Sequence, residues 1–276
     1  MQTTSSDYTK PSSTNAQPSD MLSKITPLIL TYNEAPNIER SLQKLTWANR
    51  IVVIDSYSTD ETLSILKRYP TVEVFKHEFS SFASQCNYGL SKIKTDWVLS
   101  LDADYVLSEQ MINELGSLNS QSSVNGYLVN LDYCVFGKPL RGALLPPRKV
   151  LYRREKAVYE NDGHAHRVLI KGKLGRLVSS IYHDDRKPLS RWLWAQDRYM
   201  LAEAEKLSQI SNKKLSWGDR LRKQKVFAPF IILVYCLFVK KGVLDGWHGW
   251  YYALQRTFAE MLLSLRLIEM SKTRLH

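Results

Sequence analysis

Residues Trp97–Tyr105 (WVLSLDADY) decide how this chain is organised, because an apolar run of strand character leads directly into two carboxylates, Asp102 and Asp104. Alternate side chains of a strand share a face, so the two aspartates are expected to point the same way at the end of the strand. Oxygen ligands of this kind suit Mg²⁺ or Mn²⁺, either of which binds diphosphates. An Asp-Ala-Asp turn also follows many buried strands without binding anything, so the flanking sequence has to separate the two interpretations.

The flanking sequence alternates between strand-like and helix-like segments. Residues 126–133 alternate and predict a later strand, and runs of strand character lie at 25–30, 51–54, 72–75 and 97–101, of which the first two are expected to be buried. Segments with helical spacing of apolar residues lie between them, at 35–45, about 62–68 and 80–93. The run Ile51–Ile54 is continuously β-branched, which is typical of a strand buried on both faces. This alternation predicts an α/β domain with a parallel sheet.

Polar loops follow three of the predicted strands. They are Thr31–Glu34, Asp55–Asp60 and Asp102–Asp104. In parallel α/β sheets, ligands bind just beyond the carboxyl ends of the strands. The three loops are therefore expected to meet at one edge of the sheet and to form a nucleotide site, in which Asp102 and Asp104 lie close to the diphosphate.

The motifs LTYNE at 30–34, VIDSYSTD at 53–60 and LDAD at 101–104 resemble those of the family-2 glycosyltransferases. The nucleotide-sugar domain of that family has the GT-A fold, a Rossmann-like mixed sheet with flanking helices. The resemblance covers roughly residues 25–183. Within the family, the chain looks most like the bacterial lipopolysaccharide-core glucosyltransferase-like group.

The resemblance implies a role for each residue that matches a motif. The residues expected to border the nucleotide are Thr31, Tyr32, Asn33 and Glu34. Asp55 is expected to contact the base or ribose, Asp102 the ribose or sugar, and Asp104 the divalent metal on the diphosphate. Gln85 and Asn87 match a helix where the family often places polar contacts to the donor, and His183 matches a late histidine that completes the metal site in many GT-A enzymes.

Two departures from the family pattern concern the donor site. Many members have Asp-Asp-Gly-Ser where this chain has Asp55-Ser56-Tyr57-Ser58, so a carboxylate that reads the base is absent. Tyr105 stands where the closest group often has Glu. The base and sugar of the donor therefore stay open.

The acceptor side is expected in the polar segment 161–167 (NDGHAHR). An inverting transfer needs a base for the acceptor hydroxyl proton, and the resemblance places that base here, with Asp162 as the first choice. Glu160 and the pair Asp184–Asp185 are rivals, and a capping role for Asp162 in an Asp-Gly turn is an equally weighted alternative. The basic stretch 138–156 is either a solvated face or a binding site for diphosphate, lipid phosphate or an anionic glycan.

Composition limits the partners. The 276 residues carry a net charge of +11, which favours an anionic partner such as an acidic membrane surface or a phosphorylated substrate. The basic residues do not interleave with aromatics in an RNA-binding motif, so nucleic acid is not an expected partner. The three scattered cysteines indicate a reducing compartment. Residues 1–23 are polar and expected to be a disordered tail without a signal peptide, ahead of a GT-A domain at 24–186.

Residues 187–276 are expected to form a helical, membrane-associated region. The uncharged run 226–239 is 14 residues long, short of the ~20 needed to span a bilayer, so a core helix, a re-entrant segment and an interfacial helix are all compatible with it. Cations at its ends and aromatics at 247–252 favour the membrane surface. An apolar stripe over 251–268 indicates an amphipathic helix, whose partner is either protein core, a second subunit or lipid.

Together these features predict a metal-dependent inverting transferase at the cytoplasmic face of a bacterial inner membrane, attached peripherally or by a re-entrant segment. It is expected to use Mg²⁺ or Mn²⁺ and to move a sugar from a nucleotide-diphosphate donor, such as a UDP-sugar. The acceptor is expected to be a saccharide or a lipid-linked molecule of lipopolysaccharide or exopolysaccharide synthesis. A polyprenyl-phosphate glycosyltransferase and a non-catalytic protein that binds nucleotide or membrane are the alternatives, and the oligomeric state stays open.

Overall fold

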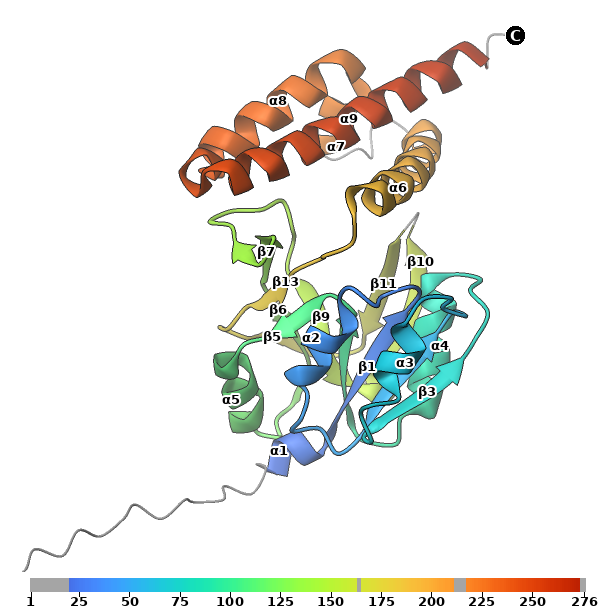
Figure 1. Cartoon of the computed structure of the whole chain (residues 1–276), viewed down its shortest axis with the longest axis vertical. Coiled ribbons are helices and arrows are strands. Elements are labelled where there is room, and N and C mark those ends of the chain that lie inside the picture. Colours follow the sequence, from blue (N-terminus) through green and yellow to red (C-terminus); the bar gives the residue numbers. More distant parts are fainter. Residues whose placement is uncertain (1–19, 163–164, 211–216, 274–276) are drawn as a thin grey trace, which may run out of the picture.

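A computed structural model describes residues 20–162, 165–210 and 217–273 of the chain (Figure 1). Its central sheet has seven strands in the order β12-β6-β9-β4-β1-β2-β3. These strands are β1 (Ile25–Thr31), β2 (Ile51–Asp55), β3 (Val72–Lys76), β4 (Trp97–Asp102), β6 (Val124–Val129), β9 (Arg148–Arg153) and β12 (Lys173–Arg176). The four strands β4, β1, β2 and β3 are parallel, whereas β9 runs antiparallel to both β4 and β6. The sheet is therefore mixed, as expected.

Three of the parallel strands, β1, β2 and β4, are buried on both faces, whereas β3 at the edge of the sheet is half-buried and exposes Glu73 and Lys76. In β2, Ile51 and Val53 join one core cluster while Val52 and Ile54 join another on the opposite face. The first cluster is covered by α2 (Ile38–Gln43), α3 (Thr62–Leu66) and α5 (Glu109–Ser117). The second is covered by α4 (Phe82–Lys92) and by the hairpin of β10 (Ala157–Asp162) and β11 (Ala165–Ile170). The four predicted strands begin at the expected residues and extend one residue further.

Two predicted boundaries were wrong. The single strand expected over 126–133 is divided at Asn130, because β6 ends at Val129 in the central sheet and β7 (Leu131–Val135) enters a second sheet. The expected tail is also too long, since Asp20–Ser23 form helix α1, whose Met21 and Leu22 are buried. The rest of that tail, residues 1–19, lies outside the described residues.

A second, smaller sheet brings the end of one of its strands next to the end of β4 in the central sheet. Its order is β5 (Tyr105–Leu107), β13 (Ile181–His183), β7 and β8 (Lys138–Pro139). The chain passes from β4 into β5 through the turn at Ala103 and Asp104, and His183 pairs with Tyr105 across the antiparallel β5–β13 ladder. The turn after β4 and the end of β13 are therefore brought side by side.

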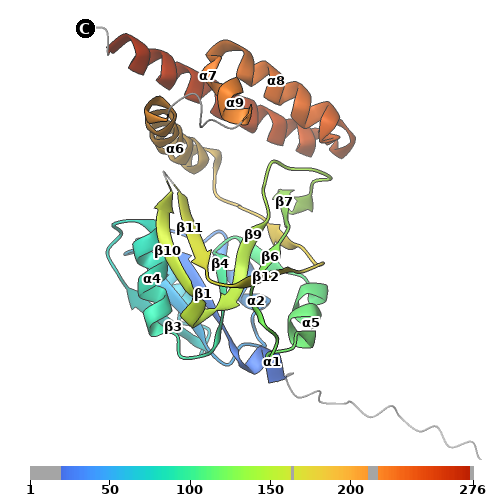
Figure 2. The same cartoon turned by 180° about the vertical axis from the view of Figure 1, so that it is seen from behind.

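The C-terminal residues form a helical layer at the end of the molecule away from α1 (Figures 1 and 2). It contains α6 (Leu189–Gln209), α7 (Trp217–Lys223), α8 (Ala228–Val234), a π-helical turn (Tyr235–Val239) and α9 (Trp247–Thr273). Apolar side chains of α6, among them Ala204 and Leu207, pack on Leu263 of α9. Both views show the hairpin β10–β11 directed towards α6. The helical layer thus lies over the part of the α/β unit that contains the predicted loops.

Candidate active site

The loops after β1 and β2 are joined through Asp55. Thr31 and Asp55 are paired in adjacent parallel strands, and Thr31 Oγ1 donates to Asp55 Oδ2 at 2.8 Å. Ser58 donates to the same carboxylate through its backbone nitrogen at 2.9 Å and its hydroxyl at 2.6 Å. Asp55 is fully buried and holds the two loops in register. Its expected contact with a base or ribose stays a prediction.

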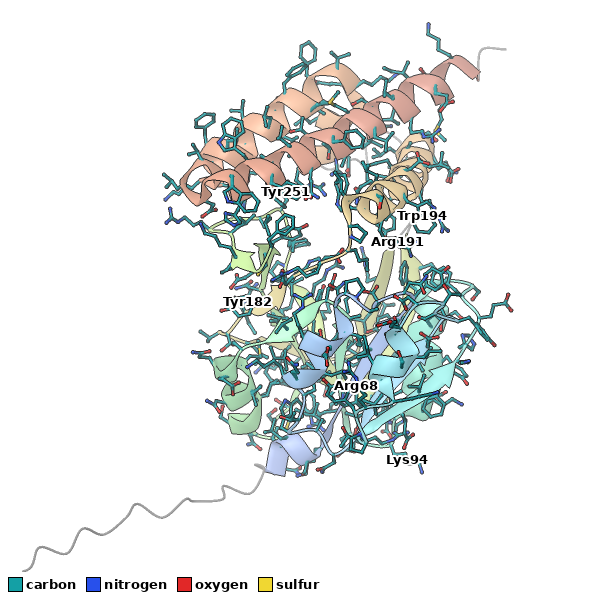
Figure 3. The ribbon with its side chains drawn as sticks, viewed as in Figure 1. Arg68, Lys94, Tyr182, Arg191, Trp194 and Tyr251 are labelled. Atoms are coloured by element: carbon teal, nitrogen blue, oxygen red, sulfur yellow. The ribbon has the colours of Figure 1, made fainter. Side chains whose placement is uncertain are left out.

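Asn33 sets the shape of the first loop. Its backbone is left-handed, with φ of 56°, and its side-chain Oδ1 accepts a hydrogen bond from Thr59 N at 2.8 Å. The neighbouring Tyr32 is exposed, and the guanidinium of Arg191 on α6 lies 5.3 Å from the centre of its ring. Arg191 and Trp194 are labelled in Figure 3, and the guanidinium lies 4.2 Å from the Trp194 ring. The helical layer therefore contacts the predicted nucleotide loop directly.

Asp104 and His183 form a buried pair. His183 Nε2 lies 3.1 Å from Asp104 Oδ2, and both side chains are largely shielded from solvent. Burial alone would raise the pKa of Asp104, but the charges of His183 and Lys187 hold that pKa below its ordinary value. The same carboxylate outweighs burial at His183 and raises the pKa of the imidazole. The second oxygen, Asp104 Oδ1, and the other ring nitrogen, His183 Nδ1, are buried without a hydrogen-bond partner among the described residues.

Asp102 differs from Asp104 in its surroundings. It is the last residue of β4 and is exposed, whereas Asp104 lies in the following turn and is buried. The period-two argument for a shared face therefore does not extend to Asp104, because the strand has already ended.

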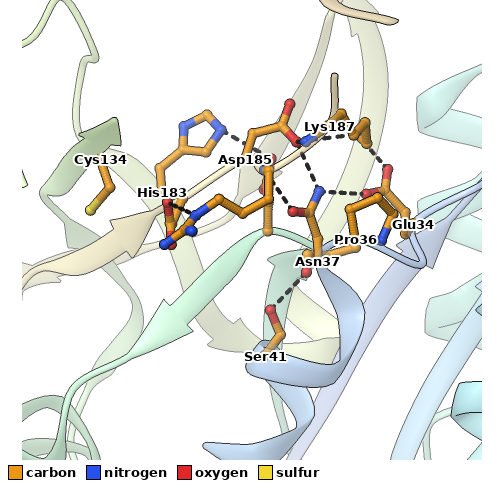
Figure 4. Close-up of polar contacts among 12 residues, drawn as sticks. Glu34, Pro36, Asn37, Ser41, Cys134, His183, Asp185 and Lys187 are labelled. Carbon is orange, nitrogen blue, oxygen red and sulfur yellow. Dashed lines mark hydrogen bonds and ion pairs between the residues drawn. The ribbon is translucent and has the colours of Figure 1, made fainter. Parts of the chain in front are cut away.

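A network of charged and amide groups joins the first loop to the segment after β13 (Figure 4). Lys187 Nζ lies 2.7 Å from Glu34 Oε1. Asn37 Nδ2 donates to Glu34 Oε2 at 3.0 Å and to Asp185 Oδ1 at 2.8 Å. Burial raises the pKa of Glu34 to about 7, although Lys187 lowers it, and the nearby carboxylates raise the pKa of Lys187 in spite of its own burial. These residues place a buried cation close to Asp104.

Asp184 has a structural position. Its carboxylate forms ion pairs with Arg40 and Arg186 and accepts a hydrogen bond from Gly137 N at 3.1 Å. Its backbone nitrogen donates to Asp104 O at 3.0 Å. These contacts tie the carboxylate to the protein itself, which removes support from Asp184 as the alternative base.

The side chains of Gln85 and Asn87 form hydrogen bonds with the protein backbone. Gln85 Nε2 donates to the carbonyl oxygens of His77 and Glu78, at 3.1 and 3.0 Å. Asn87 exchanges two hydrogen bonds with the backbone of Tyr159, at 2.9 and 3.0 Å, and so ties α4 to β10. Their expected contacts with the donor stay predictions.

The acceptor side is described in part. Asp162 is the last residue of β10, but its side chain lies outside the described residues. Glu160 on the same strand is exposed. A cavity of about 90 Å³ lies between β7, α6 and α9, lined by Tyr133, Leu144, Leu145, Trp192, Tyr252, Gln255 and Arg256. The Tyr133 ring lies 5.2 Å from the ring of His183, so this cavity is adjacent to the Asp104–His183 pair.

The comparison with protein families identifies this arrangement. Residues 28–161 match the model of glycosyl transferase family 2. The α/β domain of the chain belongs to this family. A family-2 glycosyltransferase uses a nucleotide-sugar donor, and the mixed sheet described above is GT-A-like.

The chain is also similar to individual proteins. An uncharacterized glycosyltransferase of Rickettsia prowazekii (strain Madrid E) is 24% identical over 265 residues, covering 91% of this chain and 88% of that protein. The solved mannosyltransferase PcManGT from Pyrobaculum calidifontis, in complex with GDP-Man and Mn²⁺, is 14% identical with a TM-score of 0.49, covering 92% of this chain and 90% of that one. Residues 1–349 of S. aureus TarS, in complex with UDP-GlcNAc, are 14% identical with a TM-score of 0.48, covering 91% of each chain.

The site of this family-2 glycosyltransferase also contains residues that sequence reasoning missed. Lys187, Asn37 and Arg191 are absent from the predicted set although all three contact its members. The dense polar segment 181–187 (IYHDDRK) was a signal, but its spacing does not show which charge turns towards Glu34.

Proposed function

We propose that this chain is an inverting glycosyltransferase of bacterial cell-envelope synthesis. It moves a sugar from a nucleotide-diphosphate donor, a UDP-sugar, to a saccharide or lipid-linked acceptor of lipopolysaccharide or exopolysaccharide assembly. The observation that carries the proposal is the placement of the Asp104–His183 pair beside the Glu34–Lys187 ion pair, at the ends of β1 and β4. Ligands of α/β sheets bind at that edge.

The residues present fit a divalent metal ion. No group of three or more His, Cys, Asp or Glu side chains suited to a metal occurs in the described part of the chain, so the protein offers a pair of ligands. Asp104 and His183 would hold the ion, and the unpartnered Asp104 Oδ1 and the His183 ring supply the oxygen and nitrogen ligands that suit Mn²⁺ or Mg²⁺. When bound, the ion acts as a Lewis acid that neutralises charge on the leaving diphosphate.

The chain's own residues then have separate tasks. Lys187 adds positive charge near the diphosphate. Glu34 pairs with the Lys187 ammonium group and accepts a hydrogen bond from Asn37, so these two residues fix the position of that ammonium group. Asp102, exposed at the end of β4, is free to accept hydrogen bonds from ribose or sugar hydroxyls. The acceptor oxygen attacks the anomeric carbon, its proton passes to the base, and the nucleoside diphosphate leaves.

Asp162 is the proposed base, because it ends β10 in the hairpin that points towards the helical layer (Figure 2). We expect Asp162→Asn to lower transfer to an acceptor hydroxyl about a hundredfold, since an amide accepts no proton. The rate of UDP release with acceptor checks this. Glu160→Gln, at the rival base on the same strand, should leave the rate unchanged, and a larger loss for Glu160→Gln than for Asp162→Asn would assign the base to Glu160. Full transfer by Asp162→Asn would instead favour a phosphate acceptor, which is already ionised, and hence the polyprenyl-phosphate alternative.

A donor screen tests the proposal as a whole. The purified chain is incubated with single nucleotide sugars and either Mg²⁺ or Mn²⁺, and release of the nucleoside diphosphate is followed. We expect slow hydrolysis of one UDP-sugar that requires the metal, because a site built for transfer admits water at a low rate. Tight nucleotide binding without hydrolysis or transfer for any donor would point to the non-catalytic alternative.

A further inference from the structure

The outer helices expose many large apolar side chains. Along α8, its preceding 3₁₀ turn and the π-helical turn, the exposed ones are Val226, Phe227, Phe230, Ile231, Val234, Tyr235, Phe238 and Val239. Phe230 and Phe238 are 68% and 63% exposed, although they lie in an ordered helical segment. Their neighbours Cys236 and Leu237 are buried against α9 and the segment before β9. The segment therefore has one face in the protein core and a second apolar face outside it.

Helix α9 repeats the same arrangement. Its exposed apolar residues recur at steps of three and four, at Trp247, Trp250, Leu254, Phe258, Met261, Leu265 and Ile268. At 100° per residue these positions form one stripe, nearly opposite the buried Ala259 and Leu263. Leu265 is 62% exposed while Leu263 is 1% exposed. The amphipathic pattern of α9 therefore consists of an inner apolar stripe that packs on α6 and α8, and an outer one that stays largely exposed. At two points the outer stripe meets aromatic rings of the chain, since the Phe136 ring lies 5.6 Å from that of Trp247 and the Trp192 ring 6.1 Å from that of Phe258.

Charge accompanies the outer apolar face. From Trp217 to Thr273 the chain has nine Lys or Arg and four Asp or Glu residues. The acidic side chains are engaged within the protein, since Glu260 and Asp219 pair with Arg222, Asp245 with Arg141, and Glu269 with Arg266. Cations flank the apolar segment, with Lys223 and Lys225 before it and Lys240 and Lys241 after it. The face thus combines apolar surface with excess positive charge.

We propose that the outer face of α8 and α9 docks on an anionic lipid bilayer. Exposed apolar surface on this scale is rare on soluble monomers, and apolar stripes bordered by Trp and Lys are typical of helices that lie in the membrane interface. Within the described residues, no helix combines the length and the apolar character that crossing a bilayer requires. The helices therefore lie along the membrane, with the basic residues at the level of the anionic headgroups, on the cytoplasmic face of the inner membrane.

Docking in this way has a consequence for the active site. The inner faces of α6 and α9 line the cavity next to His183, while the outer face of α9 contacts lipid. A lipid-linked acceptor held in the same membrane is then delivered to the side of the site that the helical layer covers. This docking surface is independent of which sugar is transferred.

Vesicle sedimentation of the full chain tests the proposal. We expect binding to phosphatidylcholine vesicles that contain about a third phosphatidylglycerol, with weaker binding to phosphatidylcholine alone and at about 1 M salt. The double variant Phe230→Ser, Phe238→Ser should lower the partition coefficient about a hundredfold, because two exposed aromatic rings no longer enter the interface. Lys240→Glu with Lys241→Glu should remove most of the dependence on anionic lipid.

Controls separate membrane docking from misfolding and from self-association. The matched variant Phe79→Ser, Val178→Ser changes exposed apolar residues outside the helical layer and should bind vesicles like the original chain. Circular dichroism confirms that each variant is folded. Equal vesicle binding by the Phe230→Ser, Phe238→Ser variant would overturn the proposal. A second result would also overturn it. If the original chain did not bind vesicles and formed a dimer in solution that the Phe230→Ser, Phe238→Ser variant dissociates, the face would join two copies of this chain and would not contact lipid.

Discussion

Asp104→Asn is expected to lower metal-dependent donor hydrolysis and sugar transfer about a thousandfold without unfolding the protein. The substitution keeps the size of the side chain and an acceptor oxygen for His183, but it removes the negative charge that a divalent ion requires. Initial rates of UDP release measure the loss. Titration with Mn²⁺ in the presence of UDP, followed by calorimetry, measures the accompanying loss of metal affinity.

Glu109→Gln is the matched control for this substitution. Glu109 is an exposed carboxylate five residues further along the chain, and its partner is Lys44 at 2.9 Å. Its loss is expected to leave both the rate and Mn²⁺ binding unchanged. Wild-type affinity of Asp104→Asn for UDP with Mn²⁺ would show that the metal is held elsewhere and would exclude the Asp104–His183 pair as its ligands.

The parts of the fold that the sequence predicted are those with local causes. The runs in β1, β2 and β4 are apolar and buried on both faces, so their pattern alone places them to within a residue. The division at Asn130 has no such cause, because apolar and polar residues continue to alternate into β7. Which sheet a strand joins is decided by distant partners, here Arg148–Arg153 for β6 and His183 with its neighbours for β7.

The candidate site divides in the same way. Thr31, Asp55 and Asp104 follow predicted strands, so topology alone brought them to one edge of the sheet. Lys187 is far from Glu34 in the sequence, and nothing local indicates that the two side chains meet. Gln85 and Asn87 show the opposite kind of error. Their positions in the motif predicted contacts with the donor, but the sequence does not reveal that both side-chain amides already form hydrogen bonds with backbone carbonyl oxygens.

Identifying the outer apolar face of α9 required both the sequence pattern and the packing seen in the structure. The stripe of α9 was visible as helical spacing, but its amphipathic pattern fits protein core and lipid equally well. The structure adds that a second stripe, on the other side of the same helix, already fills the core role. That distinction comes from packing, which one sequence does not contain.

The Glu34–Lys187 pair joins segments that lie far apart in the chain, so its energetic contribution can be isolated by mutation. Burial raises the pKa of Glu34 from 4.5 to about 7 while Lys187 lowers it. Without Lys187 the pKa of Glu34 in the folded state rises further above its unfolded value. A carboxyl group of this kind binds its proton more tightly in the folded protein, so the free energy of unfolding falls as pH rises from the unfolded pKa to the folded one.

We therefore expect Lys187→Met to lower the free energy of unfolding by about 3 kcal/mol at about pH 8. At about pH 5 the loss should be much smaller, because Glu34 is then neutral in the folded variant. Urea unfolding followed by circular dichroism at both pH values measures this. Adding Glu34→Gln should restore most of the loss at the higher pH, because no buried charge is left without a partner. Lys44→Met, which breaks an exposed pair of similar length, should cost less than about 1 kcal/mol at either pH. An equal, pH-independent cost for Lys187→Met and Lys44→Met would show that the network drawn in Figure 4 does not hold the first loop to the segment after β13.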